Sequence, residues 1–168
     1  MDHYFAYGSN LHPRRLRERL TVVRLVGTGF LPGRRLAFHK TGADGSAKCD
    51  VAACPGRGCG LYGALYSVDR AGWLALDVCE GRDAGYERSC VDVLVGDDVI
   101  TAQTYVAQED AIDPALRPYD WYVALVAAGA AYHRFPEEYL AMIAETPSIV
   151  DPDEDRAATM WSLVERCA

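Results

Sequence analysis

The sequence lacks any apolar run close to the ~20 residues that a membrane-spanning helix requires. Its N-terminus enters strand-like residues at once, without the basic start and apolar stretch of a secretory signal. These two absences argue against a membrane span and against a signal peptide. We therefore expect a cytoplasmic protein that does not associate with membranes.

An excess of positive charge is also missing. The chain has 17 lysine and arginine residues against 24 aspartate and glutamate residues, which gives a formal net charge of -7. Nucleic-acid phosphates and anionic lipid surfaces repel an acidic protein. The composition therefore argues against nucleic acid and against a membrane surface as partners.

Neither an internal repeat nor a linker-like segment interrupts the chain. Of its 168 residues half are hydrophobic and 24% are charged, which is the composition of an ordinary globular protein. A chain of this length buries roughly two thirds of the surface that it exposes when unfolded, so it needs no disulfide or metal to fold. We expect a single domain over residues 1–168.

Close pairs of cysteines, which structural zinc sites usually supply, are absent. The six cysteines are scattered, three of them at intervals of five residues: Cys49, Cys54, Cys59, Cys79, Cys90 and Cys167. The four histidines also lack the spacing of metal ligands: His3, His12, His39 and His133. We expect reduced cysteines that act as small hydrophobic residues, some of them buried, and neither a metal site nor a disulfide framework.

The chain is organised around residues 4–11, an aromatic run that breaks abruptly into a Gly-Ser-Asn turn. The aromatic residues favour a half-buried strand, Gly8 allows backbone dihedrals closed to other residues, and the short polar side chains bond to nearby backbone. Pro13 suits the first turn of a helix over residues 13–20. Unpaired N–H groups at such a junction favour a site for a carboxylate or an oxyanion, although an ordinary strand-to-helix turn has the same pattern.

The rest of the chain predicts strands around one helix, followed by a helical C-terminal third. Alternation and turn signals predict strands over residues 21–29, 36–39, 50–53, 59–68, 87–95 and 99–106, the last two joined by a hairpin. Residues 41–48 predict a loop beside a pocket. Helices are predicted over residues 69–79, 119–131, 136–145 and 153–167. This order favours an α+β fold in which helices surround a small closed or nearly closed sheet.

Basic residues gather in the first predicted helix, in the run Arg14-Arg15-Leu16-Arg17. Such a run is most simply a solvated helix face. One of its arginines could also attract an anionic substrate.

Residues 4–11, Tyr-Phe-Ala-Tyr-Gly-Ser-Asn-Leu, resemble the N-terminal signature of the γ-glutamylcyclotransferase family. Residues 76–81, followed by Gly85 and Tyr86, are similar to the segment around the catalytic glutamate of that family. Three further segments follow in the order and approximate spacing of the family: residues 118–119, 127–130 and 135–140. The resemblance covers about residues 3 to 146.

The resemblance implies an α+β fold with a small mixed β-barrel flanked by helices. It also implies an enzyme in which the free α-amino group of a γ-glutamyl compound attacks its own γ-carbonyl, so that 5-oxoproline forms and the amine is released. Glu80 would be the catalytic general acid and base, with its carboxylate in a partly dry cavity. By position alone, Glu80 is a solvated residue at a helix end.

The resemblance further implies a set of substrate-binding residues: Tyr7, Gly8, Ser9, Asn10, Leu11, Tyr86 and Tyr119. Backbone N–H groups of the turn would bind the α-carboxylate or the developing oxyanion. Phenols can bond a carboxylate without carrying charge, although each tyrosine has the alternative of a packed core aromatic. Neither a metal, a cofactor nor a covalent intermediate is implied, and the sequence leaves a homodimer open.

Two other functions are compatible with the same residues. One is a non-catalytic module that binds γ-glutamyl groups or small acids and has no need of a buried base at Glu80. The other is a biosynthetic enzyme that removes a γ-glutamyl protecting group by the same ring closure. Residues 43–59 and Cys79 depart from the family pattern and are expected to border the leaving amine. The sequence therefore supports the glutamyl half of a substrate better than the other half.

Overall fold

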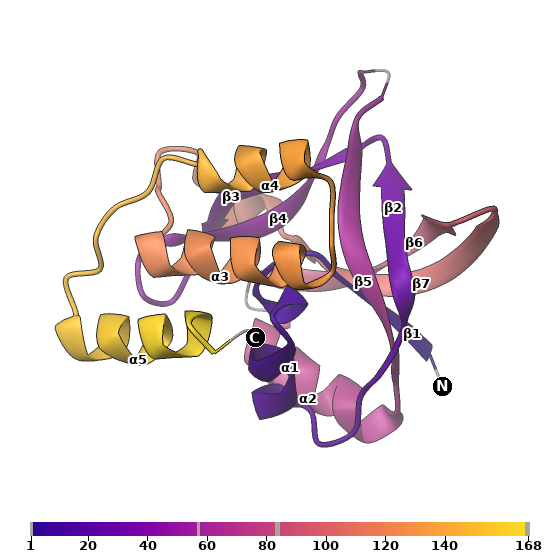
Figure 1. The fold of residues 1–168 in the computed structure, drawn as a ribbon, viewed down its shortest axis with the longest axis horizontal. Helices are drawn as coiled ribbons and strands as arrows, with labels where there is room; N and C mark the ends of the chain where they lie inside the picture. Colours follow the sequence, from indigo (N-terminus) through magenta and orange to yellow (C-terminus); the bar gives the residue numbers. More distant parts are fainter. Residues whose placement is uncertain (1, 57, 83–84, 167–168) are drawn as a thin grey trace.

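A computed structural model describes residues 2–56, 58–82 and 85–166 (Figure 1). Five strands close into a barrel in the order β1 (Asp2–Ala6), β5 (Gly60–Val68), β2 (Arg24–Pro32), β6 (Tyr86–Val95) and β7 (Asp98–Ala107). β1 runs parallel to β7, whereas the other neighbouring strands run antiparallel. The predicted α+β fold with a small mixed β-barrel is confirmed.

A separate two-stranded sheet consists of β3 (Arg34–Thr41) and β4 (Ala47–Ala53). The helices are α1 (Pro13–Arg19), α2 (Arg70–Glu80), α3 (Asp120–Tyr132), α4 (Glu137–Ala144) and α5 (Glu154–Val164), with short 3-10 turns η1 (Ser9–Leu11) and η2 (Glu109–Ala111). Figure 1 shows α3, α4 and α5 gathered on one side of the barrel strands, with α1 and α2 next to each other. In the described part of the chain, no helix has both the length and the apolar character needed to cross a membrane.

Tertiary pairing moves two boundaries away from the sequence prediction. The strand predicted over residues 21–29 lies at Arg24–Pro32, where it pairs with β5. The loop predicted over residues 41–48 is shorter, because its ends pair with each other, Thr41 with Ala47. The weak local preference of small and polar residues thus yields to cross-strand hydrogen bonds.

The prediction that all cysteines are reduced is wrong for Cys54 and Cys59, which form a disulfide. The turn between them, which contains proline and glycine, brings their Cα atoms to 6.0 Å, a usual distance for such a bond. Three cysteines of the described chain are free, the first buried and the others exposed: Cys49, Cys79 and Cys90. Cys167, the predicted end of the last helix, lies outside the described residues.

Helix α2 fixes the position of Glu80. Asp69 caps its N-terminus by accepting a hydrogen bond from a backbone N–H of the first turn. Trp73 and Leu76 are buried and hold the helix against the barrel. The helix ends at Gly81, whose left-handed backbone (φ 62°) favours glycine. Glu80 is therefore the last helical residue of a capped and packed helix.

Helix α3 lies directly against the turn that follows β1. A Cβ atom added at Gly129 would come within 2.6 Å of the backbone of Leu11 and His12. The small residue at this position therefore lets the helix approach the turn at backbone distance. Because Leu11 is fully buried at this contact, the position of the turn depends on α3.

We expect Gly129→Ala to lower the free energy of unfolding by about 1–3 kcal/mol, the usual cost of overpacking, because neither backbone can give way without moving the turn. Chemical denaturation measures this effect. Gly27→Ala is a matched control, since its Cβ would meet only a Val95 methyl group at 3.7 Å. Equal stabilities of the two variants would show that α3 does not constrain the turn.

Candidate functional site

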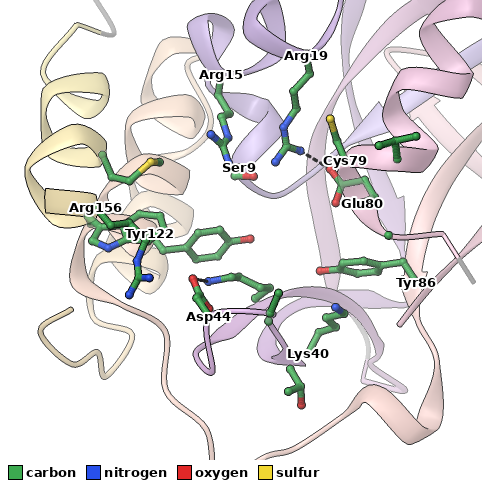
Figure 2. Close-up of a pocket in the computed structure, with 18 residues that line it drawn as sticks. Ser9, Arg15, Arg19, Lys40, Asp44, Cys79, Glu80, Tyr86, Tyr122 and Arg156 are labelled. Atoms are coloured by element: carbon green, nitrogen blue, oxygen red, sulfur yellow. Dashed lines mark hydrogen bonds and ion pairs between the residues drawn. The ribbon is translucent and has the colours of Figure 1, made fainter. Parts of the chain in front are cut away.

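A pocket of about 640 Å³ opens between the barrel and the C-terminal helices (Figure 2). Its walls come from η1, α1, the β3–β4 hairpin, the end of α2, the start of β6, α3 and α5. A narrow recess of about 20 Å³ adjoins it. Four residues line both the pocket and the recess: Ser9, Glu80, Tyr86 and Tyr122. The recess borders residues 7–10, the turn after β1, whereas the larger pocket is lined in part by residues of α5.

Glu80 is held by two side chains at the inner end of the pocket. Its Oε1 accepts hydrogen bonds from Asn10 Nδ2 at 2.9 Å and from Arg19 Nη1 at 2.5 Å. Arg19 Nη1 also donates to Asn10 Oδ1 at 2.9 Å, which closes a triangle of three side chains. Asn10 donates in addition to the Tyr4 hydroxyl at 2.8 Å. The carboxylate is therefore fixed in direction by charge and by a buried amide.

The second oxygen of Glu80, Oε2, accepts no hydrogen bond from the residues that the structure describes. The side chains of Glu80 and Arg19 retain 17% and 14% of their exposure, so this ion pair is mostly removed from water. Figure 2 shows Glu80 at the cavity with Arg19 above it. One oxygen is thus anchored and the other is available to a ligand.

Five buried tyrosines line the recess: Tyr4, Tyr7, Tyr86, Tyr105 and Tyr122. Tyr7 donates its hydroxyl hydrogen to the Tyr105 carbonyl at 2.6 Å, and Tyr86 donates to the Cys49 carbonyl at 2.5 Å. The Tyr122 hydroxyl accepts from Cys49 N at 3.2 Å. Burial raises the pKa of Tyr7, Tyr86 and Tyr122 well above the usual value, so the phenols are neutral.

Cys49 lies among these tyrosines. Burial raises the pKa of its thiol to about 12, which keeps it a neutral, unreactive group. This agrees with the predicted role of a buried cysteine as a small hydrophobic residue. Among the described residues, no three His, Cys, Asp or Glu side chains are placed to hold a metal ion.

The turn itself differs in detail from its predicted role. Gly8 has φ -110°, so it is not in the left-handed region; a Cβ there would lie 3.0 Å from the Cys49 Cβ, and close approach explains the glycine. The N–H groups of Ser9 and Asn10 donate to no described residue. Such unpaired N–H groups are common at the start of a helical turn. Leu11 is different, because its N–H donates to the Gly8 carbonyl at 2.9 Å and its side chain is fully buried. The predicted contact of Leu11 with a substrate is therefore replaced by a packing role.

Tyr119 lies outside the lining of both the pocket and the recess. It is the N-cap residue of α3, and its hydroxyl donates to the Asp44 carbonyl at 3.1 Å, which supports the β3–β4 loop. The tyrosine of α3 that reaches the site is Tyr122, three residues later. The family resemblance alone implied Tyr119, and no local pattern of the sequence distinguishes it from Tyr122.

Other residues of the pocket were not singled out by sequence. Arg15 and Arg19 are four residues apart in α1, so they lie on the same face of the helix, and both line the pocket. The helical period of the sequence could therefore have indicated that these two arginines share a face. Arg14 and Arg17 are exposed, as predicted for a solvated face. Lys48 lies in the segment over residues 41–48 that the sequence predicts beside a pocket, whereas Lys40 and Arg156 line the pocket without any local sequence signal.

Arg156 anchors α5 to the pocket wall through Asp151. Its Nη2 and Nε donate to the two carboxylate oxygens of Asp151 at 2.5 and 2.7 Å, and the Trp121 indole N–H donates to the same carboxylate at 2.7 Å. Asp151 is buried. Hydrogen bonds from Arg156 hold the pKa of Asp151 well below its usual range.

A carboxyl group whose pKa is lower in the folded protein adds stability above its unfolded pKa of about 3.9, and this stability is lost as the pH falls further. We therefore expect Asp151→Asn to lower the melting temperature at neutral pH, and the difference from the unmodified protein to shrink once the pH falls below about 3.9. Thermal unfolding across this range measures it. Asp155→Asn, at an exposed position near the start of α5, is the control. A difference that stays constant with pH would contradict the role of the Asp151 charge.

Residues 60–143 match the sequence model of the AIG2-like family. This span is half of the chain and includes Glu80, Tyr86 and Tyr122. No curated protein matches the sequence significantly.

The fold is similar to those of several solved structures. A protein named gamma-glutamyl cyclotransferase superposes with a TM-score of 0.83 at 19% identity, covering 98% of both chains. An uncharacterized protein from Homo sapiens gives a TM-score of 0.82 at 20% identity, again over 98% of both chains. An AIG2-like protein from Mus musculus gives 0.55 at 21% identity, covering 69% of this chain and 82% of that chain. At these identities, the likeness establishes the fold alone.

Proposed function

Because this chain belongs to the AIG2-like family, we propose that it is a γ-glutamylcyclotransferase, which converts the γ-glutamyl group of a small substrate into 5-oxoproline and releases the free amine. The observation that carries the proposal is the hydrogen bond between Glu80 and Asn10. It joins a carboxylate at the end of α2 to the turn after β1, and the two residues are 70 positions apart. Both segments resemble the γ-glutamylcyclotransferase family in sequence.

Ring closure requires a base that takes a proton from the α-ammonium group of the substrate. Arg19 and Asn10 hold one oxygen of Glu80, and the other oxygen is the proposed proton acceptor. The same group then delivers the proton to the departing nitrogen. Because nucleophile and carbonyl belong to one molecule, effective molarities on the order of 10⁵ M or more reduce what the protein must supply.

Negative charge develops on the γ-carbonyl oxygen as the amine attacks. The N–H groups of Ser9 and Asn10 are the proposed donors to this oxygen, since they have no partner among the described residues. The neutral phenol of Tyr122 borders the same recess and is a further hydrogen-bond donor. No covalent intermediate with the protein is needed.

The sizes of the recess and the pocket suggest which part of the substrate each of them would hold. A recess of about 20 Å³ has room for one small polar group, such as a carbonyl oxygen, because a water needs about 10–15 Å³. The rest of the substrate would occupy the larger pocket, whose wall includes Cys79, Ala43 and Asp44. These residues depart from the family pattern, so the leaving amine is where this chain would differ from its relatives.

The test is a screen of γ-glutamyl amino acids, peptides and amines for release of 5-oxoproline, which we expect for at least one class. The preferred class identifies the leaving amine, including that of a γ-glutamyl protecting group. Calorimetry on the same compounds is the companion measurement. Tight binding without 5-oxoproline release would show that the protein is a binding module of the same fold and not an enzyme.

A further inference from the structure

Both lysines of this chain line the pocket, although the sequence contains only two. Basic side chains outnumber acidic ones among the described pocket residues, five to two, in a protein of net charge -7. Three of the five have a close carboxylate: Arg19 has Glu80 at 2.5 Å, Lys48 has Asp44 at 2.7 Å and Arg156 has Asp151 at 2.5 Å. The remaining two are Lys40 and Arg15. Among the described basic residues of the pocket, Lys40 and Arg15 are therefore the two that have no carboxylate at hydrogen-bond distance.

Lys40 is the more deeply buried of these two, with 8% of its surface exposed. Its ammonium group lies 4.7 Å from the centre of the Tyr86 ring, and it donates no hydrogen bond to any residue that the structure describes. Gly85 leaves room for it, since a Cβ there would lie 2.9 Å from Lys40 Nζ. Arg15, by contrast, reaches Glu18 at 3.9 Å and keeps 28% of its side chain exposed.

The Lys40 ammonium is not one of the fully buried unpaired atoms, so it faces the pocket, and partial removal from water without an acceptor still costs free energy. Burial accordingly lowers the pKa of Lys40, while the negative charges of Glu80 and Asp44 act in the opposite direction. Figure 2 shows Lys40 beside Tyr86, on the wall of the cavity opposite Arg15 and Arg19. A ligand carboxylate in this space would supply the acceptor that the described residues do not.

We propose that Lys40 binds a carboxylate of the substrate and selects anionic γ-glutamyl compounds. This inference rests on the proposed function. The carboxylate is either the α-carboxylate of the glutamyl half or one carried by the leaving amine. Lysine suits this role because its ammonium is a compact charge that fits between a ring face and a glycine.

The first test compares Lys40→Met with the unmodified protein on γ-glutamylalanine and on γ-glutamylethylamide, which lacks the second carboxylate. We expect KM to rise about 10- to 100-fold with little change in kcat, the effect of losing a hydrogen bond to a charged group. A rise for both substrates assigns Lys40 to the α-carboxylate, and a rise for γ-glutamylalanine alone assigns it to the leaving amine. An unchanged KM for both overturns the proposal.

Arg17→Gln removes one positive charge at an exposed position and controls for a general change of the protein's field. The melting temperature separates binding from a structural role. Since the Lys40 ammonium has no hydrogen-bond partner among the residues that the structure describes, Lys40→Met should unfold at the same or a higher temperature. A lower melting temperature together with a lower kcat would indicate a structural residue and overturn the assignment.

The second test does not need turnover. Calorimetric titration with glutarate, a dicarboxylate of glutamyl length, should show binding that Lys40→Met weakens about tenfold or more. If no γ-glutamyl compound yields 5-oxoproline but this difference is found, the proposed function fails and the carboxylate site stands. If 5-oxoproline is released and neither glutarate binding nor KM depends on Lys40, the function stands and the carboxylate site is refuted.

Discussion

Glu80→Gln is expected to lower the rate of 5-oxoproline release by at least about 10²-fold, the usual contribution of a positioned acid-base group. Glutamine has the same shape and can still accept hydrogen bonds from Arg19 and Asn10 through its carbonyl oxygen. It cannot take a proton from the substrate ammonium. The loss should therefore appear in kcat, with the fold intact by circular dichroism and thermal unfolding.

Glu87→Gln makes the same chemical change at an exposed position of β6 and should leave the rate unchanged. Near-normal turnover by a well-folded Glu80→Gln protein would remove Glu80 from the mechanism. In that case, the triangle of Glu80, Asn10 and Arg19 would be a structural tie between α2 and the turn.

The ion pair with Arg19 bears on how Glu80 works as a base. An arginine at 2.5 Å fixes Oε1, and the buried amide of Asn10 fixes the same oxygen from a second direction. Only Oε2 then remains for the substrate, so the proton is taken from one defined direction. Positioning of this kind matters because proton transfer needs a heavy-atom distance of about 2.6–3.2 Å.

The sequence predicts the parts of this site that depend on local structure. The place of Glu80 at a helix end follows from the local pattern, and the structure has the same boundaries within one residue, but its role in the site follows from the family resemblance. The turn after β1 follows from the change of aromatic residues into Gly-Ser-Asn. That these two segments meet follows from the family resemblance, because no local pattern links residues 70 positions apart.

Residues that depend on helix register or on tertiary packing could not be predicted in the same way. Tyr122 lines the site and Tyr119 does not, because Tyr119 caps α3 and its hydroxyl donates to the Asp44 carbonyl. Lys48 joins the pocket wall because β3 and β4 pair with each other as a separate sheet. Arg156 reaches the pocket through its pairing with Asp151, in a helix far along the chain. No periodic pattern in the sequence indicates any of these contacts.

Blocking the α-amino group of the substrate should abolish turnover altogether. In an N-acetyl γ-glutamyl compound, the nitrogen lone pair is delocalised into the new amide, so the nucleophile is lost even when the compound binds. We expect the free-amine compound to yield 5-oxoproline without oxygen from labelled water, and the N-acetyl compound to act as an inhibitor at most. Mass spectrometry of the products measures both results.

An N-methyl compound is the matched control, since it adds bulk at the same nitrogen and keeps the lone pair. Its conversion to N-methyl-5-oxoproline, beside an inert N-acetyl compound, would assign the loss to nucleophilicity instead of size. If Glu80 activated water instead, the direct product would be glutamate carrying the label, and the acetylated compound would still be cleaved. Either of those results would refute ring closure and reassign Glu80 and the turn to a hydrolase, because a hydrolase has no use for the substrate's own amine.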